Sequence, residues 1–77
     1  MPRLPQLKAK ELAKIAEHSG FVFDRQKGSH RIYIRFSDRR VISIPFHTTK
    51  GLGRGLTAAI IKQIGLTNEG VASLLKS

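Results

Sequence analysis

The 77-residue sequence predicts an α+β domain of order α-β-β-β-α, in which helices cover one face of a three-stranded antiparallel sheet. Two observations predict this class. Residues 6–19 and 56–63 carry apolar side chains at helical spacing. Between them, three short segments alternate apolar and polar residues and are joined by short connections. A chain of this length forms one small domain, which we place at residues 1–77.

The first predicted helix covers residues 6–19, QLKAKELAKIAEHS. Its apolar stripe, at i, i+3, i+4 and i+7, consists of Ala9, Leu12, Ala13 and Ala16. Gly20 follows as the expected residue just past the helix end. His18 lies in the last turn, where a partial positive charge suits the helix dipole, so we assign it no chemical role.

Three strands are predicted next, at residues 21–25, 30–36 and 41–46. The connections at 26–29 and 38–40 are short, so both pairings are expected to be antiparallel. Pro45 has no amide hydrogen to donate and belongs at an edge or a strand end.

The faces of this sheet follow from the alternation. We expect the core face to carry Ile32, Ile34, Phe36, Ile42, Ile44 and Phe46, which requires cross-strand partners of equal parity. His30 then lies opposite residue 46 or 48 and points nominally toward the helices, with His47 on the other side. The open face is expected to carry Arg31, Tyr33, Arg35 and Ser43.

A loop with three glycines, residues 47–55, leads to the second predicted helix at about 56–63. Gly65 is expected to end that helix. Thr67 can cap a last short helix within residues 67–77, whose Val71, Leu74 and Leu75 would cover the core.

The net charge of the chain indicates the class of molecule that it binds. The chain has 14 Lys and Arg against 5 Asp and Glu, for a formal net charge of +9. Between Arg25 and Arg54 the only acid is Asp38. Such uncompensated charge favours a polyanionic partner, most often nucleic acid.

Several chemistries are excluded or disfavoured. Without cysteine there is no disulfide framework, thiolate metal site or cysteine nucleophile, and a reducing, cytoplasmic setting is the simplest expectation. No apolar run approaches the ~20 residues of a membrane span, so we expect no membrane association. The carboxylates are scattered and the three histidines lack zinc-ligand spacing, so we expect neither a metal site nor a cofactor.

The chemistry that remains possible is acid–base catalysis by a histidine with cationic side chains nearby. RNA carries its own nucleophile, the 2′-hydroxyl, and a histidine can take its proton or protonate the leaving oxygen. Cations can stabilise the charge that develops on phosphorus. The minimum set is His30 with Arg25, Lys27, Ser29 and Arg31 nearby; His47 would be structural or would contact RNA.

The same residues leave two other functions open. A non-catalytic RNA-binding module would use the open face, where Tyr33 stacks on bases between Arg31 and Arg35. An interaction protein would use its basic face mainly to bind an acidic partner. A lone histidine after Gly-Ser is more often a turn residue than a catalyst, so the residues alone do not select among the three.

Several motifs resemble one known family. These are His18-Ser19-Gly20-Phe21 at the end of the first helix, the run Arg25-Gln26-Lys27-Gly28-Ser29-His30, Pro45-Phe46-His47, and Lys62-Gln63-Ile64-Gly65-Leu66. Together they resemble the HicA toxins, or YcfA-like family, of toxin–antitoxin systems, over nearly the whole chain. One departure is Gly55-Leu56-Thr57, where the family commonly has Gly-Thr-Leu, which puts the cap of the second helix in question.

The resemblance implies a fold similar to the double-stranded-RNA-binding domain and an mRNA interferase activity, that is, an endoribonuclease acting on mRNA. It places the family's catalytic histidine at His30. It also implies a HicB-type antitoxin that binds the toxin and blocks this site, with operator DNA bound, if at all, through the antitoxin complex.

Overall fold

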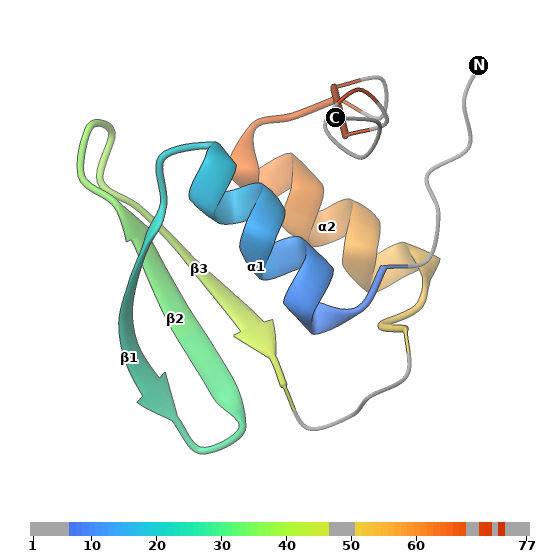
Figure 1. The fold of residues 1–77 in the computed structure, drawn as a ribbon, viewed down its shortest axis with the longest axis horizontal. Helices are drawn as coiled ribbons and strands as arrows, with labels where there is room; N and C mark the ends of the chain where they lie inside the picture. The colour runs from blue at the N-terminus through green and yellow to red at the C-terminus, as the bar shows by residue number, and fades with distance from the viewer. Residues whose placement is uncertain (1–6, 47–50, 68–69, 72, 74–77) are drawn as a thin grey trace.

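Five elements follow one another in the predicted order in the computed structural model, which describes residues 7–46, 51–67, 70–71 and 73. They are α1 (Ala9–His18), β1 (Val22–Lys27), β2 (His30–Arg35), β3 (Arg40–Pro45) and α2 (Arg54–Ile64) (Figure 1). The strands form one antiparallel sheet in the order β1-β2-β3. The predicted α+β class, similar to the double-stranded-RNA-binding domain, is therefore confirmed.

Helix α1 forms where the apolar stripe predicts it. Its first turn is fastened by Glu11, whose carboxylate accepts a hydrogen bond of 2.9 Å from the backbone N–H of Lys8. The chain leaves the helix through Gly20, which has a φ of +94° that side chains with a Cβ rarely adopt. Five residues of the helix are buried: Ala9, Leu12, Ala13, Ile15 and Ala16.

Helix α2 begins at Arg54, two residues earlier than predicted, with Gly53 as its N-cap and no capping side chain. Gly65 ends it in the left-handed conformation, as predicted. Thr67 caps the turn that follows, because its Oγ1 accepts a hydrogen bond of 3.0 Å from the N–H of Gly70. Val71 is fully buried, whereas Leu74 and Leu75 lie outside the described residues.

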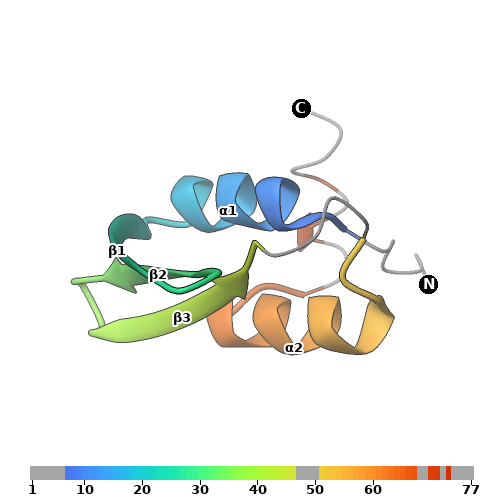
Figure 2. The same ribbon diagram turned by 90° about the horizontal axis from the view of Figure 1, so that it is seen from below.

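The face assigned to β2 is opposite to that predicted, whereas Ile42 and Ile44 of β3 face the core as predicted. Tyr33 pairs with Ile42 and Arg31 with Ile44, so partners differ in parity. Tyr33, Ile42 and Ile44 are at most 3% exposed and belong to the core that the two helices cover, with α1 in its own layer above the strands in Figure 2. The open face carries Ser43, as predicted, but it holds Val41 and, from β2, Ile32 and Ile34 in place of Arg31, Tyr33 and Arg35.

The error has a physical reason. Long arginine side chains cover apolar surface with their stems and stack their planar heads on aromatic rings. The Arg31 guanidinium lies 4.1 Å from the centroid of the Phe46 ring, and that of Arg35 lies 4.6 Å from that of Phe21. Arginine therefore occupies the helix-covered face, which the alternation assigned to isoleucine.

An arginine from each of β2 and β3 fastens one helix end to the sheet. Arg35 donates a hydrogen bond of 2.9 Å from Nη1 to the carbonyl oxygen of Ser19, just past α1. Arg40 donates one of 2.8 Å from Nη1 to the carbonyl oxygen of Gln63, in the last turn of α2. Asp38 in the connecting hairpin binds both guanidinium groups, at 2.8 Å and 3.1 Å. Cations suit helix C-termini, so the contacts stabilise both ends.

Candidate functional site

His30 lies at the open end of the sheet. It is the first residue of β2, it is exposed, and it shares a face with Ile32 and Ile34 rather than with Tyr33. Its cross-strand neighbours are Lys27 on β1 and Pro45 on β3. The expected partner, residue 46 or 48, and the expected helix-side orientation were therefore wrong. The imidazole is on the face that the helices leave uncovered.

The turn before His30 has two residues, Gly28 and Ser29. Gly28 has a φ of +61°, which places a glycine where the first central residue of a tight hairpin requires a positive value. The carbonyl oxygen of Gly28 accepts a hydrogen bond of 3.1 Å from the Gln26 amide. Because this turn is short, it sets Lys27 and His30 directly opposite each other, with Cβ atoms about 5 Å apart.

A β-bulge brings two cations to the same face as His30. The register of β1 shifts between Phe23, which pairs with Tyr33, and Arg25, which pairs with Ile32. In a regular strand, all the odd-numbered residues of β1 would lie on one face. Here Asp24 is an extra residue, and it interrupts this alternation between Phe23 and Arg25. The bulge lets Phe23 face the helix side while Arg25 and Lys27 face the open side. Nothing in the amino-acid sequence indicates this shift of register.

The charges at this end of the sheet are unequal. Arg25 forms an ion pair with its neighbour Asp24, whereas no ion pair of Lys27 is found among the described residues. Asp38 is bound to arginines of the other hairpin, roughly 16 Å from His30 along β2. There, hydrogen bonding to Arg35 lowers the pKa of Asp38. The surroundings of His30 therefore keep a positive charge that a phosphate could use.

Three other predicted site residues, Arg31, Tyr33 and Arg35, lie on the opposite face of β2 from His30. Tyr33 is 3% exposed and forms an edge-to-face pair with Phe23, with ring centroids 5.8 Å apart, so it is a core residue and presents no stacking surface. Arg31 and Arg35 also lie on the helix-covered face. The proposed binding surface of Arg31, Tyr33 and Arg35 was therefore wrong as a placement. His47 lies outside the described residues.

The residues that do occupy the open face were missed. Val22 and Val41 are 49% and 58% exposed, and each is paired with Ile34 of β2. They form a small apolar strip that continues from His30 and its cations. The signal that could have found them is the register itself, which an alternating pattern leaves undetermined when both faces of a strand carry large side chains.

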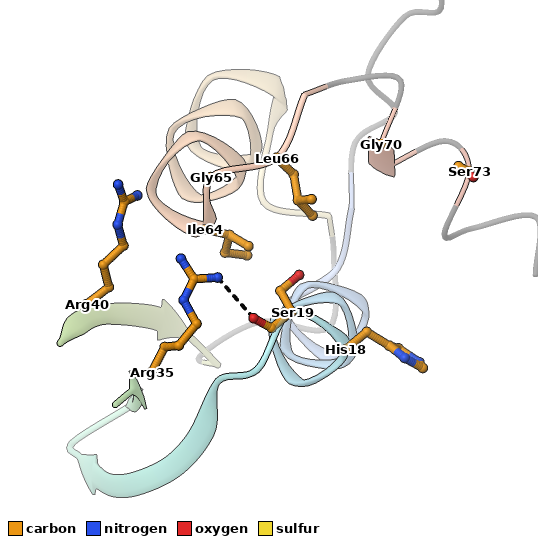
Figure 3. A pocket seen from close by; sticks show the side chains of 9 residues that line it. All are labelled: His18, Ser19, Arg35, Arg40, Ile64, Gly65, Leu66, Gly70 and Ser73. Atoms are coloured by element: carbon orange, nitrogen blue, oxygen red, sulfur yellow. Dashed lines mark hydrogen bonds between the residues drawn. The ribbon is translucent and has the colours of Figure 1, made fainter. Parts of the chain in front are cut away.

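A hollow of about 670 Å³ lies at the opposite end of β2 from His30, where α1 and α2 end (Figure 3). Its arginines, Arg35 and Arg40, are held by the helix carbonyl groups and Asp38, and His18 points away from them. The hollow does not include His30. We therefore interpret it as the junction between the helix ends and the β2–β3 hairpin, and not as part of the candidate site.

The described residues contain neither a metal-binding cluster nor a membrane-spanning helix. No group of three or more His, Asp or Glu side chains there is arranged to hold a metal ion. No helix in the same part of the chain is long and apolar enough to cross a membrane.

Comparison with known proteins identifies the family. Residues 9–66, which include both helices and all three strands, match the family described as the HicA toxin of bacterial toxin–antitoxin systems. Comparison with individual curated proteins returns no match. The match covers well over half of the 77 residues and contains His30 together with the turn, bulge and cations around it. The chain belongs to the HicA toxin family of bacterial toxin–antitoxin systems.

Proposed function

We propose that this toxin is a metal-independent endoribonuclease, an mRNA interferase, that uses His30 as its general acid–base group. One observation carries the proposal: His30 is exposed on the open face of the sheet, directly opposite Lys27 and on the face that also holds Arg25. A titratable imidazole beside cations suits RNA, whose 2′-hydroxyl is a built-in nucleophile.

The proposed reaction follows from these groups. Neutral His30 takes the proton of the 2′-hydroxyl, and the 2′-oxygen attacks the adjacent phosphorus. The bond from phosphorus to the 5′-oxygen breaks, and that oxygen leaves with a proton from solvent. Lys27 and Arg25 stabilise the negative charge on the phosphoryl oxygens in the transition state. The products are a 2′,3′-cyclic phosphate and a 5′-hydroxyl, and DNA is spared.

Ser29 and the antitoxin complete the proposal. The hydroxyl of exposed Ser29 lies in the turn beside His30, where it can donate a hydrogen bond to a phosphate oxygen. A HicB-type antitoxin is proposed to cover His30 and thereby stop cleavage, and any contact with operator DNA is proposed to run through that complex. Action on mRNA requires a cytoplasmic location.

The test uses purified protein and a defined RNA in EDTA. His30→Ala should lower the cleavage rate about 10²- to 10⁴-fold, which is typical for loss of an acid–base group, without lowering the melting temperature much. The matched control is His18→Ala, which removes an exposed histidine at the end of α1 and should cleave like wild type.

Analysis of the product ends tests the mechanism separately. A 2′,3′-cyclic phosphate supports attack by the 2′-hydroxyl. A 3′-hydroxyl with a 5′-phosphate would overturn that step, and undiminished cleavage by His30→Ala would overturn the role of His30. Loss of all activity in EDTA would show that a metal ion takes part.

A further inference from the structure

One residue contacts both chain neighbours of His30. Phe46, immediately after β3, donates a backbone hydrogen bond of 2.7 Å to the carbonyl oxygen of Ser29. The ring of the same residue carries the guanidinium of Arg31, 4.1 Å from its centroid. Residues 29 and 31 are therefore both held by Phe46, one through the backbone and one through the ring.

The ring is itself anchored. Phe46 is partly buried and packs against the hydrophobic core that α1, α2 and the sheet share. It thus connects the end of the sheet, where His30 lies, to the hydrophobic core. A residue placed in this way transmits the rigidity of the core to its two contacts.

The stacking contact with the Phe46 ring is important for the Arg31 side chain, because the buried part of its guanidinium has no hydrogen bond among the described residues. Its Nε is buried and makes no hydrogen bond to a described residue. Burial without a hydrogen bond is costly, and a ring face within about 6 Å compensates part of that cost by attracting the cation. Loss of the ring would therefore release Arg31 from its present position.

His30 needs such support. It is the first residue of its strand and follows a glycine turn, and element ends open more readily than element centres. A misplacement of about 1 Å can cost a catalytic group roughly 10²-fold in rate. We propose that Phe46 is a positioning residue for His30, acting through Ser29 and Arg31. The inference rests on the proposed catalytic function of His30.

The experiment compares kcat and KM for RNA cleavage. Phe46→Leu keeps an apolar side chain and the backbone hydrogen bond but removes the ring face, so we expect kcat to fall about 10- to 100-fold while KM changes little. Phe46→Tyr keeps an aromatic ring at this position and should therefore keep kcat close to the wild-type value. The matched control is Phe36→Leu, the same change at a side chain that is 73% exposed, which should leave both constants unchanged.

Arg31→Met tests the link from its other end and protects the test if Phe46→Leu folds poorly. It should lower kcat to a similar extent, and the double variant should be no slower than the slower single variant, because both changes break one contact. Amide hydrogen exchange at residues 29–31 should speed up in each variant, with the exchange of core residues unchanged.

The outcomes separate the two proposals. If His30→Ala is inactive while Phe46→Leu keeps wild-type kcat, the positioning role fails and the catalytic role stands. If His30→Ala cleaves normally, the proposed function fails, and the positioning of a catalytic group fails with it. If Phe46→Tyr is as slow as Phe46→Leu, the ring face is not the cause and the inference is overturned.

Discussion

Thr57 is a polar side chain that is buried in the core among the described residues. It is 0% exposed on the buried face of α2, and its Oγ1 makes no hydrogen bond to a described residue. A buried hydroxyl without a partner costs about 1–3 kcal/mol. Thr57→Val replaces that oxygen with a methyl group of similar shape, and the two residues have similar helix propensity. We expect the free energy of unfolding to rise by about 1–2 kcal/mol, the lower part of that range.

The assay is thermal and chemical unfolding of the purified protein. For a domain of this size, 1 kcal/mol corresponds to roughly 4–8 °C in Tm, so the change is easily measured. Thr67→Val is the control of opposite sign. The Thr67 hydroxyl accepts the N–H of Gly70, and loss of such a cap costs about 0.5–2 kcal/mol. A lower Tm for Thr57→Val would refute the reasoning, because it would show that the hydroxyl is hydrogen-bonded in solution.

Two other predictions concern the sheet. Tyr33→Ala should lower the free energy of unfolding by about 3–5 kcal/mol, as expected when an aromatic side chain is removed from a core. Denaturant titration measures this change. A stable variant with weakened RNA binding would contradict it and would show that Tyr33 acts as a surface residue. Asp38→Asn should destabilise the protein at pH 7, because hydrogen bonding to Arg35 holds the pKa of Asp38 below its ordinary value. That contribution is fully present above the unfolded pKa of about 3.9 and is lost as the pH falls through the lowered folded pKa. The difference in unfolding free energy between wild type and Asp38→Asn should therefore shrink at pH 3, and an equal difference at both pH values would contradict it.

Element order, antiparallel strand pairing and the C-terminal ends of the helices were predictable because local chemistry determines them. The stripe of α1, the glycines at positions 20 and 65, and the cap at Thr67 each act within a few residues, and all four are confirmed. The short turn at Gly28 likewise made the first hairpin predictable.

The assignment of the two sheet faces was not predictable in the same way. Both faces of β2 carry large side chains, and the choice between them depends on contacts distant in sequence, such as Arg31 with Phe46 and Arg35 with Phe21. The sequence pointed to His30 but not to the face it uses. With the register corrected, His30 and Lys27 share the open face, and Tyr33 leaves the candidate site for the core.

The bulge at Asp24 also bears on solubility. β1 is an edge strand of the described sheet, and all six of its residues are exposed, so its outer backbone groups could template the strand of another molecule. A bulge interrupts the regular spacing that such pairing needs, and the positive charge of Lys27 adds repulsion between identical copies. The irregularity that orients two cations toward His30 therefore also discourages edge-to-edge aggregation when the toxin is made in quantity.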